Sequence, residues 1–393
     1  MISSTQLKVP RCQDLDNKIN SQNCASSVAI GSWSGGRFMH YGQALDDEEY
    51  YALFQCAWNA GIRTFITADV YGKGRADILL GNALKGIPRE SYKLISMIGH
   101  DFYNGSRSGN RGYPRFTDPQ LRKEGNYYNY LEMAVSQSLK RLKTNYFDAI
   151  FLHNPDEIGY TNYSIWNSLY RFKKEGVTEK IGVAPGPANG FVIDLIHLFR
   201  NYGSLIDYCM AILNPLEPWP GKFILDECEK QQIRVVTRVA DYGGVLFGHM
   251  RDDHYFADGD HRAYRAEGWV AGANEKIQKF SSIAERHNMS VMQLATSWAL
   301  SQKAVGIVTP TFVKEQGEQI DDVFSRVRDV ANTPLLQLSL AECAEIECIG
   351  DNTGCMPMKG ASKRYKNERR PDEWEMRPEL QMIAMEIGWN MNW

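Results

Sequence analysis

Short apolar runs rich in β-branched and aromatic residues alternate with longer amphipathic stretches from about residue 26 to residue 313. This alternation is typical of repeated strand–helix units on a parallel sheet. The expected strands are residues 64–68, 93–98, 147–152, 180–183, 208–213, 234–239 and 306–308. The expected helices are residues 46–60, 130–142, 163–175, 191–199, 221–231, 274–286 and 291–301.

The pattern predicts seven strands, so an eight-stranded barrel needs one more. Residues 27–32 as a bottom hairpin, or an irregular strand near residue 243, are the two candidates for it. A doubly wound open sheet fits the same alternation, but it should carry a glycine-rich phosphate turn after its first strand, and none follows. The pattern therefore predicts an α/β protein with a single (β/α)₈ TIM barrel over residues 1–340.

Two stretches, residues 102–129 and residues 246–269, interrupt the alternation of strands and helices. Both follow a strand, so in a barrel they would lie over the C-terminal mouth, where substrates bind. They are either lids over a site or surface excursions that contact no substrate.

Residues 341–393 form a C-terminal extension to the expected barrel. It contains a short helix over residues 341–349, a charged stretch over 363–375 and a terminal amphipathic helix that bears Trp389 and Trp393. Two exposed tryptophans would be costly, so we expect this tail to pack on the barrel or on a second subunit. The second alternative would give a homo-oligomer.

The composition, 43% hydrophobic and 23% charged over 393 residues, excludes a disordered or fibrous chain. A net charge of -3 offers no basic field for nucleic acid. The chain has no apolar run of membrane-spanning length, and its N-terminus lacks the basic-then-apolar order of a secretory signal. We expect a cytoplasmic protein with neither a nucleic-acid nor a membrane partner.

Eight cysteines are scattered without a CxxC spacing, which is typical of reduced thiols. Cys56 and Cys209 lie in apolar runs and are expected in the core, whereas Cys355 is the candidate for an exposed thiol. No metal cofactor is expected.

Tyr71 and His153 each follow a predicted strand, so both should reach the same mouth of a barrel. A phenol beside an imidazole can give or take a proton at an oxygen. Asp69 and Arg238, also at strand ends, complete the catalytic candidates. The candidates for binding a small-molecule substrate are Trp33, His100, Asn154, Asn214, Trp219 and Asp241.

The segments GSW, GRADILLG and SLKRLKTNYFDAIFLHNPD, with the strand that leads to Tyr71, resemble the aldo-keto reductases over about residues 27–325. The resemblance implies a (β/α)₈ barrel that binds NADPH and reduces carbonyls with a tetrad of Tyr, His, Asp and Lys. It implies that Tyr71 is the proton donor and that His153 orients the carbonyl.

Two positions depart from that tetrad. Ile66 stands where the family has its Asp, and Met97 stands where it has its Lys. Losing one partner alone would leave the other charge buried and unpaired. Losing both for apolar residues of comparable bulk is a coordinated change that keeps a barrel packed, and it indicates a rebuilt site.

The cofactor positions also depart from the family pattern. Ala184 and Pro185 replace the Ser-Asn pair that holds the nicotinamide carboxamide, Met210 replaces a Gln, and Arg238 replaces the aromatic residue that stacks on the ring.

Residues 308–322 stand where the family grips the pyrophosphate and 2′-phosphate, with Thr311 in place of a Gly. The candidates for holding NADP or NAD are Ser32, Trp33, Lys314 and Gln319.

Three functions follow as hypotheses. The first is an aldo-keto-reductase-like enzyme that performs redox-neutral acid/base chemistry, such as dehydration, elimination, isomerisation or cyclisation beside a carbonyl, with Tyr71 and His153. The second is an NAD(P)H-dependent reductase or dehydrogenase with a rebuilt site. The third is a non-catalytic barrel that serves as a binding or regulatory subunit.

Overall fold

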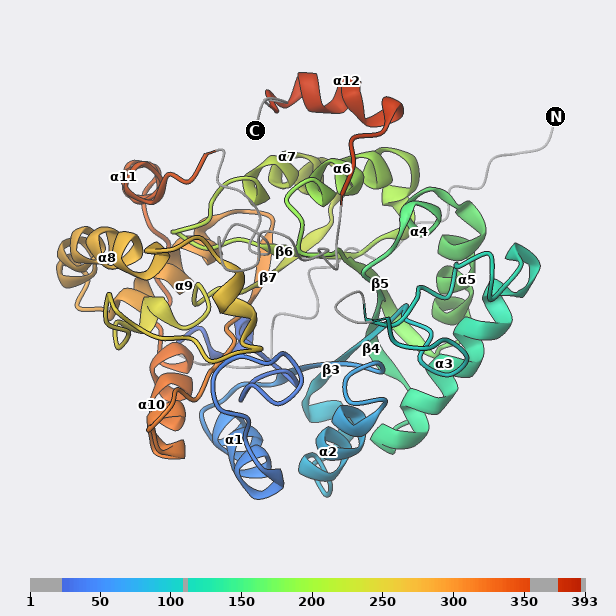
Figure 1. Ribbon diagram of the computed structural model, residues 1–393, viewed down its shortest axis with the longest axis horizontal. Helices are drawn as coiled ribbons and strands as arrows, with labels where there is room; N and C mark the ends of the chain where they lie inside the picture. The colour runs from blue at the N-terminus through green and yellow to red at the C-terminus, as the bar shows by residue number, and fades with distance from the viewer. Residues whose placement is uncertain (1–22, 109–111, 354–373, 390–393) are drawn as a thin grey trace.

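A computed structural model describes residues 23–108, 112–353 and 374–389 of the chain. Eight parallel strands follow one another around the molecule in sequence order (Figure 1). A parallel bridge between Val28 and Val308 joins the last strand to the start of the first. The expected TIM barrel is thereby confirmed. The strands are β1 (Ala29–Gly31), β2 (Thr64–Ala68), β3 (Lys93–Ile98), β4 (Phe147–His153), β5 (Thr178–Ala184), β6 (Tyr208–Ile212), β7 (Arg234–Arg238) and β8 (Val305–Thr309).

Helices surround the barrel and begin where the sequence supplies caps. Asp46 and Glu49 form a capping box before α1, and Ser290 forms one before α9. The helices are α1 (Asp47–Asn59), α2 (Arg75–Ala83), α3 (Tyr127–Leu142), α4 (Glu157–Thr161), α5 (Tyr163–Lys174), α6 (Phe191–Tyr202), α7 (Leu225–Gln231), α8 (Trp269–Arg286), α9 (Val291–Ser301), α10 (Ile320–Ala331), α11 (Leu340–Gly350) and α12 (Pro378–Glu386).

The eighth strand is where the prediction needs correction. β1 lies inside residues 27–32, but it pairs in parallel with β2 and is a barrel strand rather than a hairpin. Gly243 and Gly244 have φ angles of 68° and 100°, which turn the backbone and prevent a strand near residue 243. Helix α8 also begins at Trp269, five residues before the expected start at 274, because Val270 extends its buried face.

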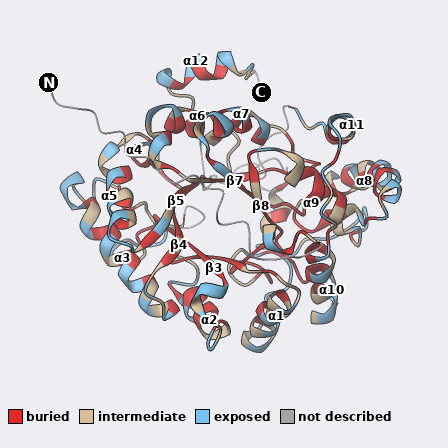
Figure 2. Ribbon diagram, turned by 180° about the vertical axis from the view of Figure 1, so that it is seen from behind, coloured by how far each residue is buried: buried red, intermediate tan, exposed pale blue. Residues whose placement is uncertain are grey.

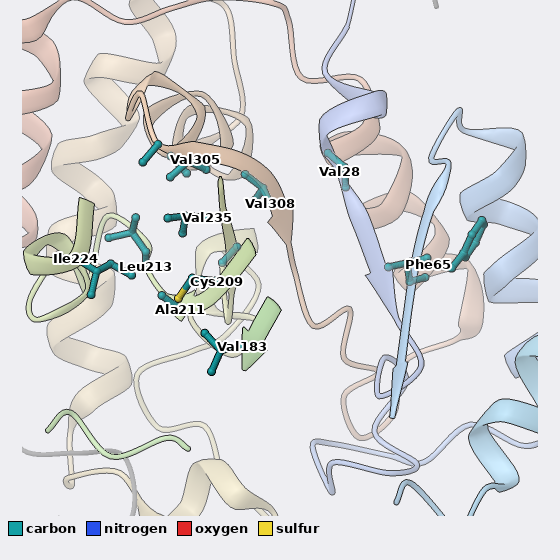
Figure 3. Packing of buried hydrophobic residues seen from close by; sticks show 14 of the residues in the cluster. Val28, Phe65, Val183, Cys209, Ala211, Leu213, Ile224, Val235, Val305 and Val308 are labelled. Atoms are coloured by element: carbon teal, nitrogen blue, oxygen red, sulfur yellow. The ribbon is translucent and has the colours of Figure 1, made fainter. Parts of the chain in front are cut away.

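Side chains of the strands alternate between two buried layers. The outer layer fills the space between sheet and helices, and Figure 3 shows Phe65, Val183, Cys209 and Val235 within it. Figure 2, coloured by burial, shows that the strands form the buried centre of the molecule. The inner layer, called the inner cluster below, consists of Ala29, Trp33, Ile66, Ala68, Ile95, Met97, Ala149, Phe151, Ala184, Met210, Val236 and Ile307.

The described part of the C-terminal extension packs on the barrel, with α12 lying over α6 (Figure 1). The Trp374 indole and the Arg377 guanidinium donate hydrogen bonds of 2.6 and 2.7 Å to the buried carboxylate of Asp194. Trp389 stacks on Trp219 with ring centroids 5.1 Å apart. Trp393, Cys355 and residues 363–373 of the charged stretch lie outside the described residues.

Of the two cysteines expected in the core, Cys209 is fully buried and Cys56 is partly buried. Across the described ranges, none of the helices combines the length and the apolar composition that crossing a bilayer requires.

Candidate active site

Two side chains from distant parts of the sequence meet at the mouth of the barrel. Tyr71 follows β2, and His153 is the last residue of β4. Their rings lie 5.8 Å apart between centroids and nearly perpendicular, at 87°. Trp33 contacts the other side of Tyr71 edge-on at 6.3 Å, so the half-buried phenol is held between an indole and an imidazole.

The floor beneath this pair is apolar. Ile66 and Met97 both point into the barrel, are almost fully buried and belong to the inner cluster, against which Tyr71 packs. A lone carboxylate or ammonium here would lose its hydration without gaining a partner. Apolar side chains at both positions therefore avoid an unpaired buried charge.

The pair is uncharged at neutral pH. Burial raises the pKa of Tyr71 well above its usual value, an effect that the Arg238 guanidinium offsets only in part. Burial, then the charges of Arg115 and Arg238, lower the pKa of His153 to about 3. Tyr71 is therefore a phenol, and neutral His153 carries one N–H. Within the described residues, its Nδ1 atom is buried and has no hydrogen-bond partner.

Arg238 lies at the end of β7, close enough to this pair for its charge to lower the pKa of both rings. It shares the inward face of β7 with Val236, and its Nη2 donates to the Gly186 carbonyl at 2.9 Å. A cavity of about 40 Å³ beside it is lined by Trp219, Glu217 and Asn352, among others. Trp219 thus lies next to Arg238, whereas Tyr71 and His153 do not line this cavity.

Sequence reasoning missed Arg115. This residue lies in the stretch after β3, and its Nη1 contacts Nδ1 of His100 at 2.9 Å while its Nε donates to the Asn154 carbonyl. The Asn154 amide contacts Nε2 of His100 at 3.1 Å, and the His100 ring lies 5.0 Å from that of His153. The only hint in the sequence was that Arg115 belongs to one of the two stretches expected over the mouth.

The structure places Asp69 away from the pair. Its backbone continues the alternation of β2, in which Ile66 and Ala68 point inward, so the Asp69 side chain faces the helices. The charges that act on it are those of Asp77, Arg141 and Asp101. Burial is the main reason that its pKa is raised well above the usual value.

Two further candidates hold loops in place. The Asn214 side chain accepts hydrogen bonds from the backbone of Leu216 and Glu217 and donates to the Val239 carbonyl. Buried Asp241 accepts hydrogen bonds from the backbone and hydroxyl of Thr311, which ties the loop after β7 to that after β8.

The four cofactor candidates are divided between two regions. Ser32 faces the helices and hydrogen-bonds Thr67, whereas Trp33 belongs to the inner cluster. Lys314 forms an ion pair with Glu49, and Gln319 lies at the start of α10. Among the described residues, no group of three or more His, Cys, Asp or Glu side chains is arranged to hold a metal ion.

Comparison with known proteins gives consistent results. The Aldo/keto reductase family matches residues 27–345. The versiconal hemiacetal acetate reductase of Aspergillus parasiticus is 33% identical over 326 residues, which cover 74% of this chain and 87% of that protein.

Two solved structures share the fold. A glycerol dehydrogenase from Gluconobacter oxydans superimposes with a TM-score of 0.63 at 22% identity, over 84% of this chain and 92% of that one. An aldo-keto reductase from Klebsiella pneumoniae, solved in complex with NADPH, gives a TM-score of 0.53 at 16% identity, over 84% and 94%.

Proposed function

The chain belongs to the Aldo/keto reductase family, and on that premise we propose that it is a nicotinamide-dependent oxidoreductase that reduces the carbonyl group of a small polar or anionic compound. The observation that carries the proposal is the pairing of Tyr71 with His153 over an apolar floor. Both side chains are uncharged donors at neutral pH, and both lie at the ends of strands that open on the mouth where barrels bind substrates.

Tyr71 and His153 act on the carbonyl oxygen. The phenol O–H and the imidazole N–H donate hydrogen bonds to it and stabilise the negative charge that develops as the carbonyl is reduced. A bound reduced nicotinamide supplies the hydride for the carbonyl carbon. Tyr71 then transfers its proton to the oxygen, and solvent reprotonates the phenolate.

The raised pKa of Tyr71 favours reduction over alcohol oxidation. An alkoxide is basic enough to take a proton from a phenol of raised pKa, whereas oxidation needs the phenolate, which this site forms with difficulty. Arg238 is the nearby cation that limits the shift. Arg238 and Arg115 also make the surroundings of the pair suitable for a carboxylate or phosphate on the substrate.

The interior of the mouth suits the ring of a nicotinamide. Trp33, Met97, Ala184 and Met210 give it an apolar surface beside Tyr71. The Klebsiella pneumoniae reductase of the same fold was solved with NADPH. We infer that Trp33, Ala184 and Met210 hold the ring end of the cofactor in this chain.

Redox-neutral chemistry, the first hypothesis from the sequence, ranks below reduction. Its motive, the paired replacement by Ile66 and Met97, is present in the structure. However, abstraction of a proton requires a base with a pKa near neutrality, and His153, with a pKa of about 3, is a weak one. The versiconal hemiacetal acetate reductase and the glycerol dehydrogenase named above are oxidoreductases by name.

Purified protein should oxidise NADH or NADPH in the presence of at least one compound from a panel of small aldehydes, hydroxyketones and keto acids. Tyr71→Phe should lower kcat/KM by about 100-fold or more, because it removes the proton donor, and should leave the Kd of the dinucleotide unchanged. Tyr163→Phe, on the exposed surface of α5, is the matched control. The proposal is wrong if calorimetry detects no dinucleotide binding, or if Tyr71→Phe reduces carbonyls as fast as the wild type.

A further inference from the structure

Across the mouth from His153, the loops after β7 and β8 meet the loop after β1. We call this region the β7–β8 corner. Arg262, which is 2% exposed, lies at its centre. Its guanidinium donates to both oxygens of Asp260 at 2.8 and 3.1 Å and to both oxygens of Glu315 at 2.6 and 3.0 Å. Asp260 also accepts a hydrogen bond from the backbone N–H of Gly42 at 2.7 Å, so all three loops are joined.

The other two cations of the corner are paired as well. Lys314 is 8% exposed and its ammonium contacts the carboxylate of Glu49, at the start of α1. Arg326, on α10, forms a two-pronged ion pair with Glu318 and donates to the Val313 carbonyl at 2.7 Å. Burial and hydrogen bonds from His254 and Arg262 act in opposite directions on Glu315, and the hydrogen bonds prevail, lowering its pKa to about 2.

Acidic side chains also occupy the N-terminus of α10, where an anion could otherwise bind. A helix N-terminus attracts anions because its first N–H groups have no partner within the helix. Here Asp321 and Asp322 lie in the first turn, and the Asp322 carboxylate accepts a hydrogen bond from the backbone N–H of Gln319 at 2.9 Å. A carboxylate of the chain itself therefore takes the N-cap N–H, and two negative charges in the first turn disfavour an added phosphate there.

The cations of the corner are already matched by carboxylates. Among the described side chains, Lys314, Arg262 and Arg326 pair with the carboxylates of Glu49, Asp260, Glu315 and Glu318, and His254 also lies 3.4 Å from Glu315. Loops after strands seven and eight are where TIM barrels commonly bind phosphate. A phosphate monoester placed here would find these cations of the described residues already paired with carboxylates, and it would have to compete with them.

A dinucleotide bound for the proposed function would lie over this mouth, and the loops after β7 and β8 are the part of it that could receive the adenosine end. β4 and β8 lie on opposite sides of an eight-stranded barrel, so a cofactor with its ring beside His153 extends across the mouth toward β8. We propose that Glu49, Glu315 and Glu318 determine cofactor specificity by excluding a 2′-phosphate, so that this enzyme uses NAD(H) rather than NADP(H). This inference rests on the proposed function.

The test is a calorimetric titration of the full chain with NAD⁺ and, separately, with NADP⁺. The wild type should bind NAD⁺ at least about tenfold more tightly, the factor that corresponds to about 1.4 kcal/mol. Glu49→Gln and Glu318→Gln should each shift the ratio of the two Kd values toward NADP⁺ by about threefold or more, since each removes one negative charge near the ribose. Glu229→Gln, on α7, breaks an exposed ion pair with Lys303 and should leave the ratio unchanged.

The outcomes separate this inference from the proposed function. Wild-type protein that binds both dinucleotides but binds NADP⁺ as tightly as NAD⁺, or more tightly, overturns the specificity assignment alone. Wild-type protein that binds neither overturns the proposed function and the inference with it. The wild-type ratio decides the matter even if a glutamine variant fails to fold.

Discussion

The floor below Tyr71 and the β7–β8 corner differ in how they treat charge in a buried place: the floor is apolar, and the corner contains paired charges. Both are buried parts of one barrel mouth. On the floor, Ile66 and Met97 occupy neighbouring strands as plain apolar side chains, and no described charge lies within the inner cluster. In the corner, Arg262 is equally buried yet meets two carboxylates through four hydrogen bonds.

The difference teaches that a buried charge is tolerated here only with a complete set of partners. Removing a whole pair costs little when apolar groups of similar volume fill the space, whereas removing one member leaves an uncompensated charge. The floor contains apolar side chains at both positions, and the corner contains its charges in pairs. The positive charge that acts on the Tyr71 phenol is that of Arg238, at the end of another strand, β7.

Among the changes that test this comparison, Met97→Lys should have the largest effect on the free energy of unfolding. The substitution buries an ammonium without a carboxylate and should lower the free energy of unfolding by about 3–5 kcal/mol, measured by urea denaturation. Ile66→Asp in the same chain should recover about 1–3 kcal/mol of the loss, because the two charges then pair. Met97→Leu, a volume-conserving change, is the control and should cost less than about 1.5 kcal/mol. Strict additivity of the two charged substitutions would show that the positions do not interact.

Glu315→Gln should have the next largest effect, in the corner. It leaves Arg262 with Asp260 alone and should lower the free energy of unfolding by about 3 kcal/mol, the value of a pKa held near 2 instead of 4.5. Since the folded-state pKa is depressed, this stabilisation is complete above pH 4.5 and is lost as the pH falls toward 2. The melting temperature of the wild type should therefore fall more steeply over that interval than that of the variant. Parallel curves would argue against the ion pair.

The pH profile of carbonyl reduction should show the smallest effect. His153 stays neutral down to a pH of about 3, and the raised pKa of Tyr71 keeps the phenol protonated at alkaline pH. Values of kcat/KM, corrected for cofactor stability, should thus be flat between about pH 5 and pH 9. An inflection near the ordinary histidine pKa of about 6.5 would mean that His153 titrates during turnover.

Much of the fold was predictable because strands of a barrel carry a strong local pattern. β2 and β3 have the predicted bounds, since each is a short run rich in buried apolar residues. β1 was harder, because three residues that include Gly31 carry too little pattern to distinguish a barrel strand from a hairpin. Its role depends on pairing with β2, which is a tertiary contact.

The residues of the candidate site also differ in whether the sequence alone could identify them. Tyr71 and His153 were identifiable because each follows a buried run, and strand ends of a barrel converge. Asp69 met the same criterion, but the alternation of β2 turns it toward the helices. Arg115 had no local pattern to mark it, because it reaches His100 only through the folding of an irregular loop.

By itself, the sequence predicted the barrel, the convergence of Tyr71 and His153 at its mouth, and apolar side chains at positions 66 and 97. These features are local in the chain or follow from strand order. Only the tertiary structure decided how charges are compensated, because the partners lie far apart in the sequence. Lys314 is 265 positions from Glu49, and no spacing rule links them. Electrostatics at the mouth depends on such distances in space, and these determine both the neutrality of the catalytic pair and the preference proposed for NAD(H).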